Sequence, residues 1–150
     1  MQKFPDLPPI WTATVALAIW IIGRLVPVMS FSTPTWLLVL PAMVGLLLIL
    51  WSAFWFWRKR TSIEPGHTPS ALIVEGPYRI SRNPIYLGMW AVLLSIALWV
   101  GALTGFVPFL VFPLIITRRF IIPEEDALRQ AFGAEATAYF AATRRWVLIR

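Results

Sequence analysis

Long apolar stretches alternate with short polar ones along this chain, and their lengths predict helices that cross a membrane. A membrane-spanning helix needs about 20 predominantly apolar residues. No charged residue occurs from Asn83 to Thr117, and the GALTG sequence at 101–105 predicts a turn that divides this stretch into a helical hairpin. The predicted spans are residues 10–29, 35–57, 84–100 and 106–122. We therefore expect an all-α integral membrane protein in which residues 1–150 form a single domain.

The polar segment after the fourth span predicts an amphipathic helix on the membrane surface. It begins PEEDALRQAFG at Pro123, its apolar residues recur at helical spacing, and Gly133 is a candidate break. Acidic residues in a first turn complement the dipole of a helix start, which is one explanation of Glu124, Glu125 and Asp126. The alternative is that one of these carboxylates reaches a polar ligand.

Composition supports the membrane class and excludes several kinds of site. Of the 150 residues, 59% are hydrophobic and 13% charged, and the mean hydropathy is +0.73. The chain has no Cys, which excludes disulfides, thiolate zinc sites and Cys nucleophiles. His67, the only histidine, lies in a loop rich in Gly and Pro, so we expect no metal site. The net charge of +6 comes from Lys and Arg beside apolar runs, which favours membrane anchoring over nucleic-acid binding.

The distribution of basic residues predicts the orientation. With the N-terminus inside, Arg24 is the one basic residue that does not fall on the cytoplasmic side. The first apolar run is not followed by a small-residue cleavage site and is expected to be a retained helix. Both termini and both long polar segments, 58–83 and 118–150, are therefore predicted to be cytoplasmic, and any polar chemistry must be built from those two segments.

An Asn-Pro pair marks the start of the third span. Asn83 is expected to cap the helix and Pro84 to occupy its first position. Arg79 and Arg82 would then converge with the free amides of the helix start on a site for an anion such as a carboxylate or phosphate. Alternatively, the two arginines merely anchor the span to lipid headgroups.

Two separated motifs resemble one known family. Thr61-Ser62-Ile63, GPYRISRNPIYLG at 76–88, PEEDALRQAFG at 123–133 and the later Tyr139 and Arg145-Trp146 occur in the family's order. Together they resemble the integral membrane methyltransferases related to isoprenylcysteine carboxyl methyltransferase and phosphatidylethanolamine N-methyltransferase. The resemblance extends from about residue 61 to residue 146.

The resemblance implies that S-adenosylmethionine binds between segments 61–88 and 118–146, on the cytoplasmic side. The backbone near Leu72 and Ile73 would lie by the adenosine, and Glu124 and Glu125 would hold polar groups of the cofactor. One wall would comprise Gly76, Pro77, Tyr78, Arg82, Asn83, Pro84 and Tyr86. The methyl acceptor would be lipophilic or small and would partition into the bilayer. An ammonium acceptor must lose a proton before methylation, and Tyr86 or Glu125 is the catalytic candidate for that step.

The acceptor itself stays open. Ser70 and Asn83 stand where the eukaryotic carboxyl methyltransferases have histidines, which fits the bacterial and phospholipid-type branches and predicts a bacterial inner-membrane protein. A carboxylate, an amine or a thiol could be methylated. Trp51, Trp55 and Trp57 could edge a lateral entrance or form an ordinary aromatic belt. The rival interpretations are a four-helix exporter, an NADPH-dependent reductase of the sterol type and a non-catalytic bundle.

Overall fold

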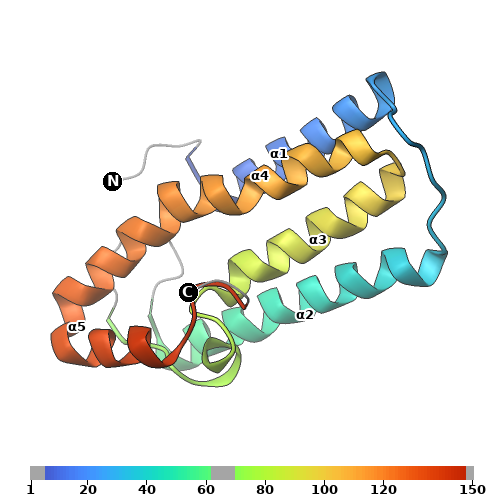
Figure 1. Ribbon diagram of the computed structural model, residues 1–150. Helices are drawn as coiled ribbons and strands as arrows, with labels where there is room; N and C mark the ends of the chain where they lie inside the picture. Colours follow the sequence, from blue (N-terminus) through green and yellow to red (C-terminus); the bar gives the residue numbers. More distant parts are fainter. Residues whose placement is uncertain (1–5, 62–69, 148–150) are drawn as a thin grey trace.

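The computed structural model describes residues 6–61 and 70–147, and its regular structure is helical (Figure 1). Within these ranges no strand forms, and the one β-type contact is an isolated bridge between Ser30 and Ala102. The helices are α1 (Pro8–Leu25), α2 (Thr35–Lys59), α3 (Pro84–Val100), α4 (Phe106–Ile116) and α5 (Ile122–Ala142). Shorter turns are η1 (Gly76–Arg79), η2 (Leu103–Gly105) and the π-helical η3 (Thr117–Ile121). The all-α prediction is confirmed.

Helix α3 is central and contacts α1, α2 and α4. A core of fully buried side chains lies between α1, α3 and α4 and includes Ile19, Leu93, Phe112 and Ile116. Helix α2 packs on the other side of α3, and the two helices run side by side in Figure 1. This arrangement holds the start of α3 and the end of α2 at the same end of the bundle as α5.

Glycines bring the backbones of α2 and α3 into contact. A Cβ atom on Gly45 would lie 2.5 Å from the Gly88 carbonyl oxygen, and one on Gly88 would lie 2.6 Å from the Gly45 carbonyl oxygen. Side chains larger than hydrogen cannot fit at that separation, so small residues permit the approach, as in membrane helix pairs generally.

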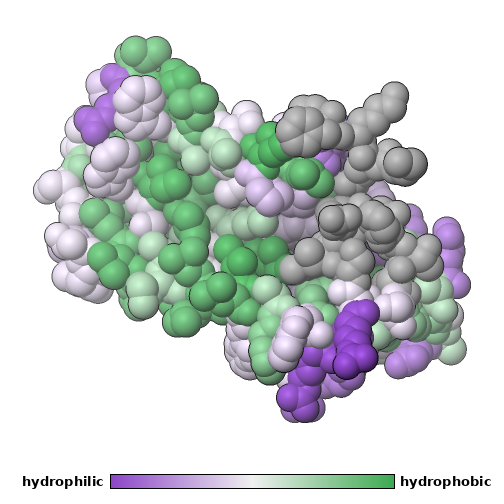
Figure 2. Space-filling view, turned by 180° about the vertical axis from the view of Figure 1, so that it is seen from behind, coloured by the Kyte–Doolittle hydropathy of each residue, from purple (hydrophilic) through white to green (hydrophobic). Residues whose placement is uncertain are grey.

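The outer surface of the bundle is apolar. Leu47 and Leu50 on α2 and Leu110 and Leu114 on α4 are 59–65% exposed. Figure 2 shows apolar side chains over much of one face, with most hydrophilic side chains toward one end and a few at the opposite end. Three helical stretches are long and apolar enough to cross a membrane, and α3 is a shorter apolar helix. Exposing an apolar surface of this extent to water would be unfavourable, so the chain is an integral membrane protein.

The helix bounds differ from the predicted spans mainly at the first and fourth. Helix α1 ends at Leu25, whereas the first predicted span ran to residue 29, and Met29 has a positive φ of 49°. Helix α2 runs on to Lys59, and α3 has the predicted bounds. The turn after α3 is confirmed, since Gly101 ends that helix in the left-handed conformation, with φ 68°.

The predicted α-helix begins at Ile122, with Pro123 in its first turn, but this start is not a free helix end. Residues 117–122 are helical, so α4, η3 and α5 form one continuous helical stretch. A π turn widens the helix and changes its hydrogen-bond register, and Pro123 follows this turn after one intervening residue. The acidic run therefore does not lie at a free helix N-terminus, and complementing a dipole does not explain it.

Only part of this long stretch can cross a bilayer. Its 40 residues, Leu103–Ala142, would extend about 60 Å, twice the thickness of the hydrocarbon core. Charged residues begin at Arg118 and mark the end of the apolar part. The break at Gly133 is confirmed, with φ 52° and ψ −116°, and the chain beyond it turns back toward the start of α3 (Figure 1).

Candidate functional site

The two motif-bearing segments meet through two hydrogen bonds, each donated by a tyrosine hydroxyl. The Tyr86 hydroxyl donates to the Glu124 carboxylate Oε1 at 2.6 Å, and the Tyr139 hydroxyl donates to the Tyr78 carbonyl at 2.8 Å. These bonds join residues 38 and 61 positions apart in the sequence. The two segments therefore contact each other, whereas the cytoplasmic location of this contact stays a prediction.

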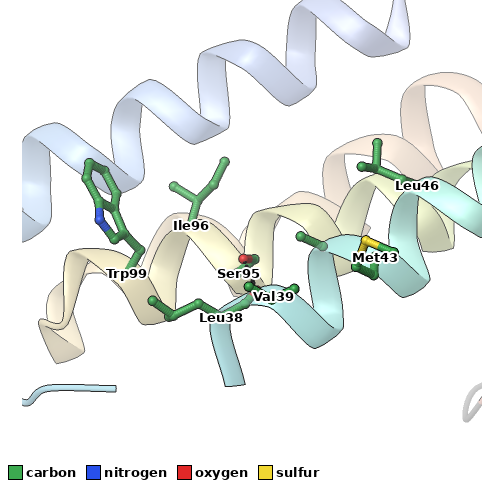
Figure 3. Close-up of a pocket in the computed structure, with 8 residues that line it drawn as sticks. Leu38, Val39, Met43, Leu46, Ser95, Ile96 and Trp99 are labelled. Atoms are coloured by element: carbon green, nitrogen blue, oxygen red, sulfur yellow. Dashed lines mark hydrogen bonds between the residues drawn. The ribbon is translucent and has the colours of Figure 1, made fainter. Parts of the chain in front are cut away.

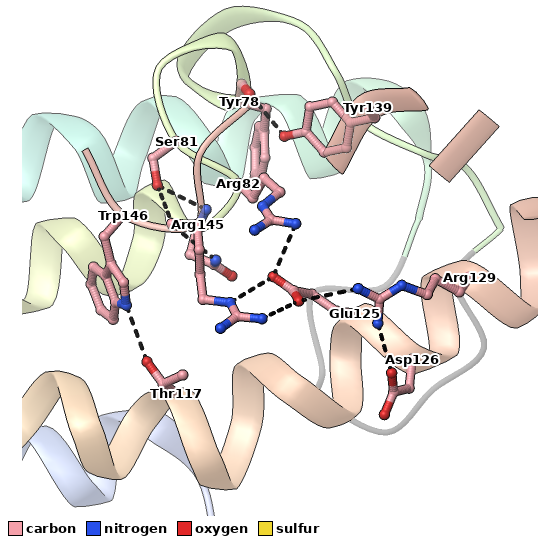
Figure 4. Close-up of polar contacts among 11 residues, drawn as sticks. Tyr78, Ser81, Arg82, Thr117, Glu125, Asp126, Arg129, Tyr139, Arg145 and Trp146 are labelled. Atoms are coloured by element: carbon pink, nitrogen blue, oxygen red, sulfur yellow. Dashed lines mark hydrogen bonds and ion pairs between the residues drawn. The ribbon is translucent and has the colours of Figure 1, made fainter. Parts of the chain in front are cut away.

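Glu125 is the centre of a buried charge cluster (Figure 4). It is 3% exposed and accepts hydrogen bonds from Arg145 Nε at 3.0 Å and Arg145 Nη2 at 2.6 Å. Arg82 Nη1 lies 3.4 Å from Glu125 Oε1, and Arg129 Nη2 lies 3.9 Å from Oε2. A buried carboxylate requires such compensation, because removing a charge from water is costly.

This cluster contains several arginines but one buried carboxylate, so its cationic groups are in excess. The guanidinium groups of Arg82 and Arg129 lie 4.7 Å and 5.0 Å from the centre of the Phe140 ring, a cation–π arrangement. The Arg82 side chain is only 10% exposed, and its Nε is buried with no hydrogen-bond partner among the described residues. Such a donor is rare in a folded protein and is available to a bound anion or polar ligand.

Asn83 has a different role from the one predicted. Its side chain does not cap α3; instead, Asn83 Nδ2 donates to the Arg145 carbonyl at 3.1 Å, and the Ser81 hydroxyl donates to the same carbonyl at 2.9 Å. Pro84 does occupy the first helical turn, as expected. The Asn83 side-chain amide and the Ser81 hydroxyl together therefore hold the C-terminal segment against the start of α3.

The predicted convergence of two arginines at this helix start is not formed. Arg79 is exposed, whereas Arg82 is directed to Glu125. The anion-binding potential therefore resides in Arg82, Arg129 and Arg145 and not in the start of α3.

The segment after α5 is inserted into the protein. The Arg82 backbone amide donates to the Arg144 carbonyl at 2.9 Å. Trp146 is 5% exposed, and its indole nitrogen donates to the Thr117 hydroxyl at 3.1 Å, in the π turn. These contacts hold Arg145 beside Glu125.

Glu124 has an environment unlike that of its neighbour. Burial raises the pKa of the Glu124 carboxyl from 4.5 to about 7, the hydrogen bond from Tyr86 opposes the rise, and the charge of Glu125 adds to it. Burial also raises the pKa of the Tyr78 hydroxyl, and the charge of Glu124 contributes to that rise. Glu124 thus shares one polar region with both tyrosines.

Gly76 and Trp55 form a second close contact at this end. Gly76 has φ 59°, and a Cβ atom there would overlap the Trp55 indole nitrogen. That nitrogen is buried and has no partner within the described ranges. Trp51 and Trp57 are 47% and 77% exposed. Trp55 therefore directs a polar atom into the protein, whereas the exposure of the other two fits an aromatic belt.

The chain between α2 and α3 supplies the apolar part of the site. Leu72, Ile73 and Tyr78 are 9%, 6% and 7% exposed, and Pro77 is fully buried. The Tyr78 and Phe56 rings meet edge to face, 6.0 Å apart. The structure therefore places an apolar surface beside the polar atoms of α5.

A family model described as phospholipid methyltransferase matches residues 36–135, which are 100 of the 150 residues. The chain belongs to the phospholipid methyltransferase family. It is a membrane methyltransferase, in agreement with the resemblance of its motifs, and the exporter, reductase and non-catalytic interpretations are set aside. Searches of curated proteins and of solved structures gave no match.

A groove between α2 and α3 lies apart from the polar cluster of this methyltransferase (Figure 3). It has a volume of about 330 Å³ and no charged residue in its lining. Its one hydroxyl, from Ser95, already donates to the Leu38 carbonyl. Its lining residues are Leu38, Val39, Ala42, Met43, Leu46, Ser95, Ile96 and Trp99. The groove offers an apolar surface and no catalytic group.

No cluster of three or more His, Cys, Asp or Glu residues that could hold a metal ion occurs in the part of the chain that the structure describes. His67, Ser62 and Ile63 lie outside the described residues, so their predicted roles stay predictions.

Several residues of this polar cluster were not predicted from the sequence. Arg129 lies four positions after Glu125, and that helical spacing could have indicated the ion pair. Phe140, Ser81 and Thr117 carry no comparable signal, because their partners are distant in sequence.

Proposed function

We propose that this methyltransferase uses S-adenosylmethionine, the donor general to its family, to methylate a lipophilic or small acceptor that partitions into the membrane. The observation that supports this best is the hydrogen bond between Tyr86 and Glu124, because it joins the two family motifs at one place. In the described part of the same cytoplasm-facing segments and the end of α2, two buried polar atoms have no partner, namely Trp55 Nε1, which lies against Gly76, and Arg82 Nε. Unpartnered buried donors next to apolar side chains suit a ligand with both polar and aromatic parts.

The proposed cofactor contacts combine both kinds of surface. Leu72 and Ile73 supply an apolar surface for the adenosine, and Arg82 supplies a donor for the carboxylate of the amino-acid part. The full proposed set is Leu72, Ile73, Gly76, Pro77, Tyr78, Arg82, Asn83, Pro84, Tyr86, Glu124 and Glu125. When bound, S-adenosylmethionine supplies an activated methyl group on a sulfonium centre, so the chemistry that is difficult for a protein belongs to the cofactor.

The protein then has to hold the acceptor and keep water away. Aligning two bound reactants removes much of the entropic barrier to a bimolecular reaction. The interlocked segment that ends at Trp146 and the hydrogen bond from Tyr139 to Tyr78 make this end of the bundle rigid enough for such alignment. Tyr86 and Glu125 are the proposed catalytic residues, because one of them would accept the proton that an ammonium acceptor must lose.

We place the reaction at the cytoplasmic face of a bacterial inner membrane, with both termini cytoplasmic. The support is the positive-inside distribution of Lys and Arg, with Arg24 as the exception. An acceptor from the bilayer is supported by the apolar exterior of the helices that lead to the site. The acceptor classes differ in proton chemistry, since an ammonium acceptor must lose a proton before methylation whereas a carboxylate or thiolate need not.

Thermal unfolding of the purified protein in detergent tests the cofactor. Each of S-adenosylhomocysteine, NADPH and a cationic drug is added separately, since a ligand that binds the folded state raises its apparent stability by about 2.7 kcal/mol at one hundred times its Kd. We expect a shift with S-adenosylhomocysteine alone. Arg82→Ala should abolish this shift, whereas Arg79→Ala, a matched change at an exposed arginine of the same segment, should retain it. A shift with NADPH alone would refute the proposal.

A further inference from the structure

The apolar groove lies at the end of the bundle opposite the polar cluster. Its floor is the last part of α3, at Ser95, Ile96 and Trp99 (Figure 3). One wall is the first part of α2, from Leu38 to Leu46. The ends of α1 and α3 and the start of α2 lie together in Figure 1, away from α5. The groove therefore faces the membrane leaflet opposite the polar cluster.

The groove has the length and the surface of a site for a lipid acyl chain. From Leu38 to Leu46 it follows α2 for about 12 Å, whereas one leaflet of the hydrocarbon core is about 15 Å thick. Its volume is about 330 Å³. The Ser95 hydroxyl already donates to the Leu38 carbonyl, so the floor offers no free hydroxyl to a polar ligand. An apolar chain is the occupant that this surface fits.

A cation lies at one end of the groove. The Arg24 guanidinium carbon is 5.8 Å from the centre of the Trp99 ring, a cation–π arrangement, and Trp99 is the lining residue nearest the end of α3. Arg24 belongs to the last turn of α1 and is exposed. None of the ion pairs formed within residues 6–61 and 70–147 includes Arg24. The guanidinium at this end therefore has no counter-charge from those residues.

The chain has no acidic residue in the segments that form this end of the bundle. None occurs in residues 7–63 or 76–123, which contain α1, α2, α3 and α4. A second copy packed in the same orientation would likewise bring apolar helices and no acid to Arg24. A phosphate group supplies the missing charge, because guanidinium groups bind phosphate through charged hydrogen bonds. The seven acidic residues of the chain are Asp6, Glu64, Glu75, Glu124, Glu125, Asp126 and Glu135.

We propose that this groove binds one anionic phospholipid of the leaflet opposite the polar cluster, with an acyl chain along α2 and α3 and the phosphate beside Arg24. Trp99 joins the two parts of the site, since its ring lines the groove and lies under the guanidinium. Tryptophan commonly takes such a place at the boundary between lipid chains and headgroups.

This lipid is distinct from the methyl acceptor. Trp99 follows Tyr86 by 13 residues on one helix, so the headgroup lies about 20 Å from the hydrogen bond between Tyr86 and Glu124. The inference requires only that the chain be an integral membrane protein. It does not depend on the cofactor or on the acceptor.

Photocrosslinking in vesicles tests the site. The full-length protein is reconstituted in dioleoyl phosphatidylcholine with a trace of a phospholipid that carries a diazirine in its acyl chain. The headgroup of this probe is phosphatidylglycerol in one preparation and phosphatidylcholine in the other, and labelled residues are located by peptide mass spectrometry. We expect the anionic probe to label the groove about fivefold more, the preference that one basic residue at a membrane surface supplies. In 1 M salt the screening length is about 3 Å, and the preference should decrease.

Two variants separate the headgroup contact from the chain contact. Arg24→Gln removes the charge and should abolish the preference for phosphatidylglycerol. Its matched control is Arg58→Gln, because Arg58 also lies over a tryptophan ring, at 5.6 Å, but at the other end of α2; the groove should keep its preference. Ala42→Phe fills the groove and should reduce its labelling by both probes, whereas Ala13→Phe, at an exposed position of α1, should not.

The remaining outcomes would overturn the proposal. Equal labelling of the groove by both probes, unchanged in Arg24→Gln, would show that no anionic headgroup is selected. Labelling spread evenly over the exposed residues of α1, α2 and α4 would show contact with bulk lipid only. Because the chain has no cysteine, Ala42→Cys also detects a second copy. A disulfide-linked dimer formed by oxidation in vesicles would show that protein, and not lipid, covers the groove.

Discussion

Replacing Glu125 by Gln should destabilise the protein far more than any other single change of an acidic residue on α5. Glutamine keeps the shape of the side chain but removes its charge. The change weakens two charged hydrogen bonds from Arg145 and the ion pair with Arg82, whose side chain is 10% exposed. Removing one partner of a buried ion pair costs about 3–5 kcal/mol, because the remaining charge stays buried without compensation.

The expected loss lies at the lower end of that range. The Arg145 side chain is 27% exposed and can regain water, and glutamine retains one carbonyl acceptor, so we expect about 3 kcal/mol. For a chain of this size, 1 kcal/mol corresponds to about 2–4 °C, and the Tm in detergent should fall by about 6–12 °C.

Asp126→Asn is the matched control for this prediction. Asp126 is adjacent in sequence and pairs with Arg129 at 2.8 Å, but the two side chains are 56% and 48% exposed. Exposed pairs contribute less than about 1 kcal/mol and are screened by salt. If the Tm of Glu125→Gln falls no further than the Tm of Asp126→Asn, the view that Glu125 is a buried counter-ion is refuted.

Three further predictions concern packing and pH. Gly88→Ala should separate α2 from α3, because its Cβ would lie 2.6 Å from the Gly45 carbonyl oxygen, and should cost about 1–3 kcal/mol in chemical unfolding. Gly76→Ala should weaken S-adenosylhomocysteine binding measured by calorimetry, since the new Cβ must displace the Trp55 indole and φ is 59°; unchanged affinity would contradict this. Folding raises the pKa of Glu124 from 4.5 to about 7, so its stabilising contribution is complete below pH 4.5 and is lost as pH rises through 7. As the pH rises from 5 to 8, the Tm of the wild type should therefore fall relative to the Tm of Glu124→Gln. A Tm difference that stays constant with pH would contradict this prediction.

The sequence by itself determined the helices and the part of the molecule where polar chemistry can occur. Apolar runs long enough to cross a bilayer have few alternatives to a helix, because backbone groups in lipid must be hydrogen-bonded within the segment. Local signals also placed Pro84 at the start of α3, Gly101 at its end and the break at Gly133. The charge pattern placed both motifs at one end of the bundle, where Tyr86 and Glu124 now meet.

Only the tertiary structure decided what the individual polar residues do. Pattern alone could not distinguish Glu124 from Glu125, since adjacent residues on a helix share local signals and differ in which side chains of other segments they face. Asn83 looked like a helix cap but donates to Arg145, 62 residues away. Pro123 looked like a free helix start, but the π turn before it joins α5 to α4. The environment of a polar group depends on burial and on distant partners, and these come from packing, which hydrophobic periodicity does not encode.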